Sequence, residues 1–419
     1  MHMTRFSALP AALALAALLA AAAPAARCAA PQGAGPRGAA PERASPDQAA
    51  SKSAAPENAA PENAAAQNAG PLPAQADAPF AVRRIAAFDR PWAIAFLPDG
   101  RLVLTEKAGR MFLVTQAGAK TAIDGVPAAY DRGQNGMLDV APSPDFARDR
   151  LLYFTRVAPE KGGGALILAR ARLDESGGRA RLSELTTLWR QRPASRGGQP
   201  GGIIAFSPDG RHLFLTVGDR MEPDTAQDPE AARGKILRLN PDGSAPPDNP
   251  MAGQAGIRAL TWSTGHRNAY GLAFAPDGTL WEHEMGPRGG DELNRIRPGG
   301  NYGWPEVSNG DQYSGWPIPR HATRPEFDAP SLYWTPVIAP AGLAFYRGTA
   351  FPAWQGSALI GGLRAEGLVR VAFGKDGVPR QADRWSLDRR IRDVAVAADG
   401  AVWLIEDGSG AGLLRLTAK

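Results

Sequence analysis

The chain has 419 residues, including 48 glycines and 38 prolines, and 21% of its residues are charged. This length allows one large domain or two ordinary ones with a buried core, and the glycine and proline content predicts many turns. The formal charge of +5 comes mainly from arginines spread along the sequence, without a basic run or a basic stripe interleaved with aromatic residues, which argues against nucleic-acid binding.

Residues 1–30 have the pattern of a secretory signal peptide. A basic start is followed by the run LPAALALAALLAAAAPAA and then by small residues. A membrane anchor is the alternative, but the run is rich in alanine and is broken by Pro24, whereas a spanning helix needs about 20 strongly apolar residues. A lipoprotein signal is disfavoured because Arg27 directly precedes Cys28. We therefore expect a periplasmic protein without stable membrane insertion after cleavage.

Cys28 is the only cysteine in the chain, and it lies at the expected cleavage region. The mature protein is therefore predicted to lack disulfides, thiolate catalysis, cysteine-ligated zinc and iron–sulfur clusters. Residues 31–79 are dominated by Ala, Pro, Gln, Asn and Glu, with the near-repeat AAPENAAPENAA. Such a segment buries too little apolar surface to offset its ordering entropy, so it is predicted to be a disordered linker before a folded domain at residues 80–419.

The folded region repeats one layout, in which a short apolar strand, a Pro/Ala-Asp-Gly turn and a second apolar strand follow one another. The four clear copies are AIAFLPDGRLVLTE from Ala93, GIIAFSPDGRHLFLTVGD from Gly202, GLAFAPDGTLWEHE from Gly271 and VAVAADGAVWLIED from Val394. Two degenerate copies begin at Leu138 and Ala341. The Asp-Gly pair suits a tight hairpin because glycine accepts positive φ and aspartate tolerates local backbone bonding.

Further strand-like segments follow each unit, such as GRMFLVT, GKILRLN, DELNRIR, GLVRVAF and GLLRLT. Six units with this spacing predict an all-β fold, a six-bladed β-propeller. A pair of β-sandwiches is the alternative, but it does not explain one recurring motif. The sequence after Phe80 has no long amphipathic helical pattern, which argues against an α/β barrel or a doubly wound fold.

Propellers gather their ligands around the central channel, so the chemically rich loops are expected to meet there. Taken in chain order, GQNGMLDVAPSPDF, GKILRLNPDGSAPPDNP, the block from TGHRN to NYGWP, YWTPVIAPAG and RRIRDVAVAADG resemble the soluble periplasmic PQQ-dependent sugar dehydrogenases of the aldose or glucose/sorbosone type. The resemblance implies oxidation of an aldose to its lactone, with electrons passed to a quinone or a small redox protein.

The resemblance also implies a cofactor site. PQQ is a planar quinone with three carboxylates, and arginine suits such a ligand because it is permanently charged and bidentate. The positions that match the family are Gln134, Arg267, Asn268, Arg364, Arg390 and Arg392. Arg364 stands where the family usually has lysine, which keeps the charge but alters the geometry.

The same resemblance assigns calcium to the segment HEMGPRGGDELN. In the family, the carbonyls of the Gly-Pro step, here Gly286 and Pro287, face a calcium ion that also contacts PQQ. Glu292 and the carbonyl of Tyr302 match a second, structural calcium site, and Asp291 matches a nearby acidic residue. Calcium binds six to eight hard oxygen ligands, so carbonyls on a turn suit it.

The catalytic base is where this sequence departs from the family. The family uses a histidine where QPGGIIAFSPDG has Gln199, and an amide is no general base near neutral pH. Asp219 matches the acid that orients this histidine, and it is the candidate to take the proton itself. Arg267 is expected to stabilise the charge that develops on the quinone. Met285 also replaces a residue that is commonly polar.

Two alternatives to a sugar dehydrogenase stay open at this point. One is a calcium-dependent sugar lactonase, and the other is a catalytically impaired propeller that binds a carbohydrate or a protein partner. The sequence has no GxGxxG that opens a helix after a strand and no GxSxG motif, which disfavours nicotinamide binding and serine hydrolase chemistry.

Overall fold

The computed structural model describes residues 66–419. The predicted signal peptide and most of the predicted linker lie outside these residues. The described part of the chain consists of strands joined by turns, with short helical turns only, so the all-β prediction is confirmed. None of the helices in residues 66–419 has the length and apolar character needed to span a bilayer.

One sheet has eight strands, in the order β3-β4-β5-β6-β10-β9-β8-β7. It consists of two antiparallel meanders joined where β6 and β10 run parallel, with Ile123 opposite Ala180. Its strands are β3 (Pro91–Phe96), β4 (Leu102–Glu106), β5 (Arg110–Val114), β6 (Lys120–Asp124), β7 (Met137–Pro142), β8 (Leu151–Glu160), β9 (Gly163–Ser176) and β10 (Arg179–Arg190).

Two further sheets are four-stranded antiparallel meanders in chain order. The first contains β11 (Gly201–Phe206), β12 (Leu213–Val217), β13 (Lys235–Leu239) and β14 (Thr261–Thr264). The second contains β21 (Pro340–Phe345), β22 (Ala358–Gly362), β23 (Gly367–Phe373) and β24 (Pro379–Ser386).

The remaining sheets combine strands that are distant in the sequence. One has the order β1-β20-β18-β16-β15 and one the order β2-β27-β26-β25, while β17 pairs with β19. The strands are β1 (Gln67–Asn68), β2 (Phe80–Phe88), β15 (Ala269–Phe274), β16 (Leu280–Glu284), β17 (Arg288–Gly289), β18 (Asp291–Arg295), β19 (Gly310–Asp311), β20 (Leu332–Trp334), β25 (Ile391–Val396), β26 (Val402–Glu406) and β27 (Ala411–Ala418). The helical turns are α1 (Phe146–Asp149), Pro223–Ala226, Arg258–Leu260, His321–Thr323 and Pro352–Trp354.

The repeated sequence units form hairpins between the first two strands of each meander, as predicted. In the Asp277–Gly278 turn, the Asp277 carboxylate accepts a hydrogen bond from the Thr279 backbone at 2.9 Å, and Gly278 has φ of 86°. This is the local bonding and positive φ that make Asp-Gly suitable for a tight turn. In the two degenerate units, α1 and the turn Pro352–Trp354 replace the Asp-Gly turn.

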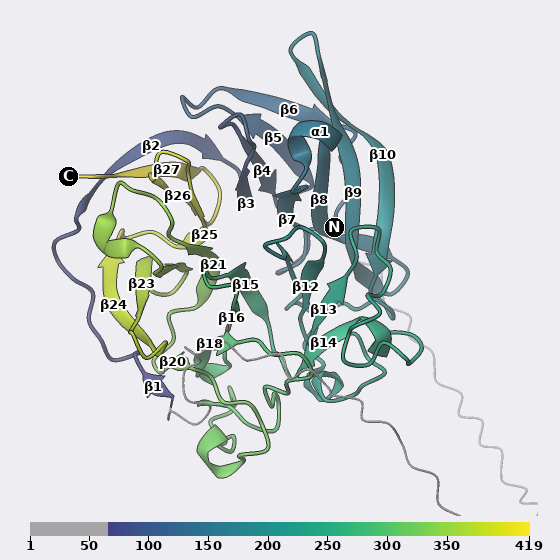
Figure 1. Cartoon of the computed structure of the whole chain (residues 1–419), viewed down its shortest axis with the longest axis vertical. Helices are drawn as coiled ribbons and strands as arrows, with labels where there is room; N and C mark the ends of the chain where they lie inside the picture. The colour runs from purple at the N-terminus through teal and green to yellow at the C-terminus, as the bar shows by residue number, and fades with distance from the viewer. Residues whose placement is uncertain (1–65) are drawn as a thin grey trace, which may run out of the picture. The chain divides into compact units, whose positions relative to one another are not determined.

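The first strands of successive meanders contact one another in the order β3, β7, β11, β15, β21 and β25, and β25 in turn contacts β3. These six strands together line a cavity of about 170 Å³. Figure 1 shows them gathered around the centre of the described part, with the later strands of each meander farther out. Pairing of β2 with β27, from Phe80 opposite Ala418 to Phe88 opposite Ala411, joins the beginning of this arrangement to its end.

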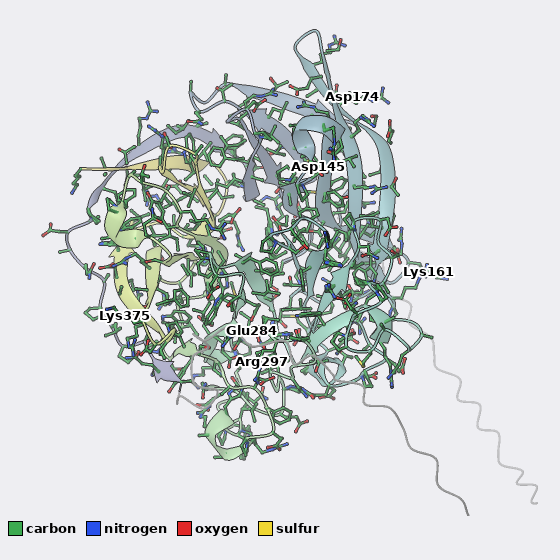
Figure 2. The ribbon with its side chains drawn as sticks, in the orientation of Figure 1. Asp145, Lys161, Asp174, Glu284, Arg297 and Lys375 are labelled. Carbon is green, nitrogen blue, oxygen red and sulfur yellow. The ribbon has the colours of Figure 1, made fainter. Side chains whose placement is uncertain are left out.

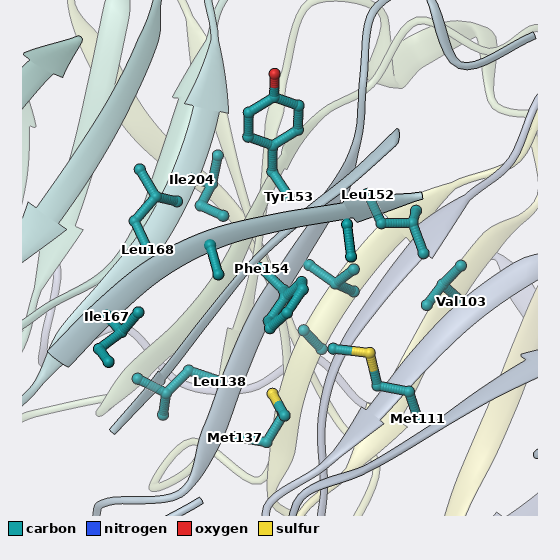
Figure 3. Close-up of a cluster of buried hydrophobic side chains, with 14 of the residues drawn as sticks. Val103, Met111, Met137, Leu138, Leu152, Tyr153, Phe154, Ile167, Leu168 and Ile204 are labelled. Carbon is teal, nitrogen blue, oxygen red and sulfur yellow. The ribbon is translucent and has the colours of Figure 1, made fainter. Parts of the chain in front are cut away.

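Apolar side chains between the sheets form the core. The second strands β4, β12, β22 and β26 are buried or nearly buried along their whole length, which explains why they are read as continuous apolar runs. The largest cluster joins strands of the eight-stranded sheet to β11 through Met137, Phe154, Leu168 and Ile204, as Figure 3 shows. The loops that begin and end these strands are therefore held on a rigid base.

Residues 66–79 differ from the linker prediction because they pack along two sheets. β1 pairs in parallel with β20, and Gln75 forms a bridge with Trp385. The Asn68 side chain both donates to the Thr335 carbonyl at 3.0 Å and accepts from the Thr335 backbone N–H at 2.9 Å. Chain pairing thus begins at Gln67, since the backbone groups of this segment find partners even though it has few large apolar residues.

Candidate functional site

The candidate residues cluster where the first strand of a meander begins and the second strand ends. Gln199 lies just before β11, Asp219 just after β12, Arg267 and Asn268 just before β15, and Gly286 just after β16. Antiparallel hairpins place these positions at one end of the sheets. The topology therefore brings together residues that are up to 87 positions apart, from Gln199 to Gly286.

Arg267 occupies the centre of this group and is buried. Its Nη1 donates to the carbonyl oxygens of Met285 at 2.8 Å and Gly286 at 3.1 Å. Its guanidinium carbon lies 5.3 Å from the centroid of the Trp304 ring, and its Nη2 donates to the Tyr313 hydroxyl at 3.3 Å. The guanidinium is thus held between the loop that follows β16 and two aromatic rings.

Gln199 connects Arg267 to Asp219. In the amide orientation that satisfies both neighbours, the side-chain nitrogen donates to Asp219 Oδ1 at 2.5 Å and the side-chain oxygen accepts from Arg267 Nη2 at 2.7 Å. Gln199 has φ of 49°, a left-handed backbone conformation that is uncommon outside glycine. The amide therefore bridges the Asp219 carboxylate and the Arg267 guanidinium.

Asp219 is a buried carboxylate with several donors around it. Its Oδ1 also accepts from the Met221 backbone N–H at 2.8 Å, and its Oδ2 accepts from the Trp304 indole N–H at 2.9 Å. Burial raises the pKa of Asp219 to about 6, although these hydrogen bonds and Arg267 act in the opposite direction. A carboxylate with a pKa near the working pH can accept and release a proton.

Gln134 and Asn268 support this arrangement through the backbone. The Gln134 side-chain oxygen accepts from the Gln199 N–H at 2.6 Å, and the Asn268 side-chain oxygen accepts from the Gly201 N–H at 3.3 Å. Gln134 itself is exposed, whereas Asn268 is buried. The structure thus brings Gln134, Gln199, Asp219, Arg267 and Asn268 into one hydrogen-bonded group.

Arg390 and Arg392 form a second group around Asp407. Arg390 Nε donates to Asp407 Oδ2 at 2.9 Å, and Arg392 Nη2 donates to Asp407 Oδ1 at 2.8 Å. The Arg392 guanidinium lies over the Trp92 ring at 4.4 Å and 6.0 Å from the Tyr270 ring centroid. Tyr270 comes two residues after Asn268, so this group adjoins the first. Arg364 is exposed.

The loop after β16 is fixed by Asp291, which accepts three backbone hydrogen bonds. The donors are Gly286 at 2.9 Å, Ile338 at 2.8 Å and Ala339 at 2.7 Å. Burial raises the pKa of Asp291 to about 7. Gly286 is required sterically, because a Cβ there would lie 2.1 Å from the Gly289 carbonyl oxygen. Asp291 therefore shapes the Gly286–Pro287 step by bonding to its backbone.

Glu292 and Tyr302 line one small cavity together with Gly286, Arg267 and Glu284. The Tyr302 carbonyl oxygen lies 3.2 Å from the His321 Nε2. Burial, followed by the neighbouring Glu284, raises the pKa of Glu292 well above its ordinary value. Figure 2 shows Glu284 well inside the described part of the chain, whereas Lys161 and Lys375 lie at its margin.

Comparison with known proteins identifies the family to which the chain belongs. The family model for glucose/sorbosone dehydrogenase matches residues 88–415. The chain belongs to this family of PQQ-dependent sugar dehydrogenases. Aldose sugar dehydrogenase YliI of Escherichia coli (strain K12) is 37% identical over 344 residues, which cover 79% of this chain and 91% of the relative.

Solved structures of family members agree with the fold. A crystal structure of a glucose dehydrogenase is 40% identical, with a TM-score of 0.75, and the match covers 81% of this chain and 100% of that one. The PQQ-bound form of aldose sugar dehydrogenase from Streptomyces coelicolor is 30% identical, with a TM-score of 0.66, and the match covers 83% and 99% of the two chains. The family resemblance read from the sequence motifs is therefore confirmed.

Three residues of the site were missed in the sequence. Trp304 donates to Asp219, Tyr313 contacts Arg267, and Glu284 accepts hydrogen bonds from the backbone N–H groups of Arg267 and Asn268. Trp304 stands in the NYGWP motif and Glu284 in LWEHE, so the motifs contained them. Their roles depend on the pairing of distant loops, which the sequence does not display.

Proposed function

We propose that this member of the glucose/sorbosone dehydrogenase family is a periplasmic, PQQ- and calcium-dependent oxidoreductase that oxidises an aldose to its lactone. The six meanders are, in this proposal, the six blades of a β-propeller with the site at one end of its channel. The observation that carries the proposal is the Gln199 bridge, because it holds a carboxylate and a guanidinium at fixed positions in one buried group.

The residues present fit an anionic quinone. Arg267 has a buried Nε without a hydrogen-bond partner in residues 66–419, Arg390 and Arg392 share a single carboxylate, and Arg364 is exposed. Arg390 and Arg392 together carry one more positive charge than Asp407 neutralises, which suits a ligand with carboxylates. When bound, PQQ supplies a two-electron acceptor for the hydride of the sugar carbon.

Asp219 is the proposed general base, in place of the expected histidine. The hydroxyl proton of the sugar C1 moves to the carboxylate as the C1 hydride leaves, which forms the carbonyl of the lactone. Asp219 Oδ1 is occupied by Gln199 and Met221, whereas Oδ2 has Trp304 as its donor and a further acceptor position. Gln199 orients the carboxylate, and Arg267 stabilises negative charge that develops on the acceptor.

Calcium is proposed at the Gly286 and Pro287 carbonyls and at Glu292 with the Tyr302 carbonyl. The donor types fit, since all four are oxygen ligands. The Gly286 carbonyl oxygen already accepts Arg267 Nη1 at 3.1 Å. A calcium ion and the guanidinium are therefore expected to share or exchange this carbonyl.

The natural electron acceptor is proposed to be a quinone or a small redox protein, and export is proposed from the signal-like N-terminus. Reconstitution of the purified mature protein with PQQ and Ca²⁺ tests the function. Addition of an aldose should bleach the bound quinone to the quinol spectrum and support dye reduction. A protein that binds sugar without this spectral change would instead be a binding propeller, and one that hydrolyses lactones without PQQ would be a lactonase.

A further inference from the structure

Four polar side chains lie on one face of the β16–β18 ladder, buried between sheets. Glu282 is opposite Asn294 and Glu284 is opposite Glu292 in this antiparallel pair. Since residues two apart in a strand point to the same side, all four side chains share one face. His266, from the loop before β15, completes the group: its Nδ1 lies 3.7 Å from Glu284 Oε1.

Several atoms in this group have no hydrogen-bond partner within residues 66–419. They are His266 Nδ1, Glu282 Oε1 and Asn294 Oδ1, and their side chains are 1%, 0% and 0% exposed. Within the group, Asn294 Nδ2 donates to Glu282 Oε2 at 3.0 Å and to Glu292 Oε2 at 3.3 Å. Buried polar atoms normally find partners, so three orphans that belong to one cluster indicate a missing ligand.

The contact of His266 with Ser263 allows the ring to present a lone pair to the carboxylates. Its Nε2 lies 2.8 Å from the Ser263 hydroxyl oxygen. With the proton on Nε2 and donated to Ser263, the Nδ1 lone pair faces the carboxylates. Metal-bound histidines are held in this manner, with the second ring nitrogen donating to a neighbour. Without a cation or a proton between them, a lone pair and a carboxylate oxygen would repel each other.

The negative charge of this group also favours a bound cation. Three carboxylates, Glu282, Glu284 and Glu292, are buried together, and Asp291 adds to the negative potential at Glu292. One carboxylate oxygen of Glu282, one of Glu284 and one ring nitrogen of His266 all lie within 4.8 Å of one another. A divalent cation would neutralise two of these charges and bind all three atoms, whereas protonation would neutralise them one at a time.

We propose that His266, Glu282 and Glu284 bind one divalent cation, with Asn294 Oδ1 as a further oxygen ligand. One imidazole with carboxylates favours Mn²⁺ or Zn²⁺ over Ca²⁺, which prefers oxygen alone. This set differs from the Glu292 carboxylate and Tyr302 carbonyl expected for a second calcium, although Glu292 lies beside it. It adjoins the PQQ site through Glu284, but the contacts that carry it do not depend on bound PQQ, so it does not rest on the proposed function.

The site has a structural consequence for the catalytic arginine. Glu284 Oε2 accepts hydrogen bonds from the backbone N–H groups of Arg267 and Asn268. A cation on Glu284 Oε1 would fix this carboxylate, and with it the backbone that carries the Arg267 guanidinium. Glu284 and the cation are thus positioning elements behind the site.

The test uses the mature protein without PQQ or sugar, stripped with EDTA and titrated separately with Mn²⁺, Zn²⁺ and Ca²⁺. Metal content by mass spectrometry should reach one Mn²⁺ or Zn²⁺ per chain at this site. The melting temperature should rise by about 5 °C at a hundredfold excess over Kd. Glu282→Gln should weaken Mn²⁺ binding at least about tenfold, as expected for loss of a ligand.

The effect of Mn²⁺ on the melting temperatures of the parent and of Glu282→Gln separates a metal site from a proton-sharing cluster. Removal of one like charge should leave the metal-free variant as stable as the metal-free parent or more stable, while the parent is more stable with Mn²⁺. Asp139→Asn, which changes a carboxylate on β7 that bonds to the Ile204 backbone, is the matched control and should keep the full Mn²⁺ response.

Three results would each overturn the proposal. The first is a parent melting temperature indifferent to EDTA and to all three cations. The second is Mn²⁺ affinity that is unchanged in both Glu282→Gln and His266→Gln. A response to Ca²⁺ alone, insensitive to His266→Gln, would assign the cation to oxygen ligands and refute the imidazole site. If the variants do not fold, electron paramagnetic resonance of Mn²⁺ with the parent protein still reports whether nitrogen is a ligand.

Discussion

Substitution of Asp219 by asparagine separates the proposed base from a merely structural acid. Asp219 has a pKa of about 6, raised by burial from an ordinary 3.8. This difference of about 2 units corresponds to about 3 kcal/mol. An acid whose pKa is higher in the folded state binds more protons when folded, so the free energy of unfolding falls as the pH rises from about 4 to about 6. Asp219→Asn should abolish this part of the pH dependence.

The net stability change at pH 7 should be small. The variant avoids burial of a charge, which is worth about 3 kcal/mol, but its amide nitrogen would face the N–H of Met221 or Trp304, and an unsatisfied donor costs about 1–3 kcal/mol. Activity, in contrast, should fall by about 10²–10⁴ because a positioned base is lost. Stability and activity are thus expected to change independently.

The assay is dye reduction by the PQQ-loaded protein between pH 5 and pH 8. In the parent, kcat/KM should rise about tenfold from pH 5 to pH 7, because the ionised fraction of a group with pKa about 6 rises from about a tenth to about nine tenths. Asp139→Asn is the control for burial alone, since burial raises the pKa of Asp139 to about 7 outside the hydrogen-bonded group. Asp219→Asn activity within a factor of about three of the parent would refute the role of Asp219.

Three further outcomes are expected. Gln199→His should change the rate of dye reduction little, because Asp219 already serves as the base, and a large gain would show that the position had lost its base and would contradict the role of Asp219. Arg267→Ala, Arg390→Ala and Arg392→Ala should each weaken PQQ retention about 10- to 100-fold, as loss of a charge-assisted bond worth about 1.5–3 kcal/mol implies; equilibrium dialysis measures it, and unchanged affinity in all three would remove the quinoprotein proposal. Chelation should release PQQ and lower the melting temperature if the Gly286 and Pro287 carbonyls hold calcium, and a PQQ absorbance indifferent to EDTA would contradict this.

The strands were predictable because their signals are local. An apolar run, an Asp-Gly turn and another apolar run specify a hairpin without reference to the rest of the chain, and all six predicted units are hairpins. The long strands β9 and β10 carried no such motif. Their parallel contact with β6, through Ala180 and Ile123, depends on positions far apart in the sequence.

The sequence predicted most of the residues that form the site, but it predicted fewer of the contacts between them. Arg267, Asn268, Asp219 and Gln134 were identified from motifs, and they lie in one hydrogen-bonded group. In the sequence, Gln199 indicated only that the histidine base of the family is absent. In the structure its amide joins Asp219 to Arg267, a role that depends on the left-handed backbone at Gln199 and on loops from three sheets.

The buried acids on β16 and β18 were not predictable as a cluster. Glu282 and Glu284 flank His283, and Glu292 lies between Asp291 and Leu293; acids spaced in this way ordinarily indicate a solvated strand face. The ladder between Glu284 and Glu292 and the approach of His266 from another loop bury this face instead. A charge pattern thus predicts which side chains share one face of a strand, but it does not predict which segments of the chain cover that face.

The contact between Asn68 and Thr335 limits how far the N-terminus can be trimmed. The Thr335 hydroxyl oxygen accepts from the Gly290 N–H at 2.8 Å, so a segment near residue 68 steadies the backbone of the loop that carries Gly286. A chain cut at Phe80 would lose this contact and would leave β20 as an open edge, which can pair with a second molecule. We expect such a shortened chain to elute as larger species in size-exclusion chromatography, whereas a chain cut before Gln67 stays monodisperse. A shortened chain that keeps β1 paired therefore has to begin within the alanine- and proline-rich segment, and not at the first long strand.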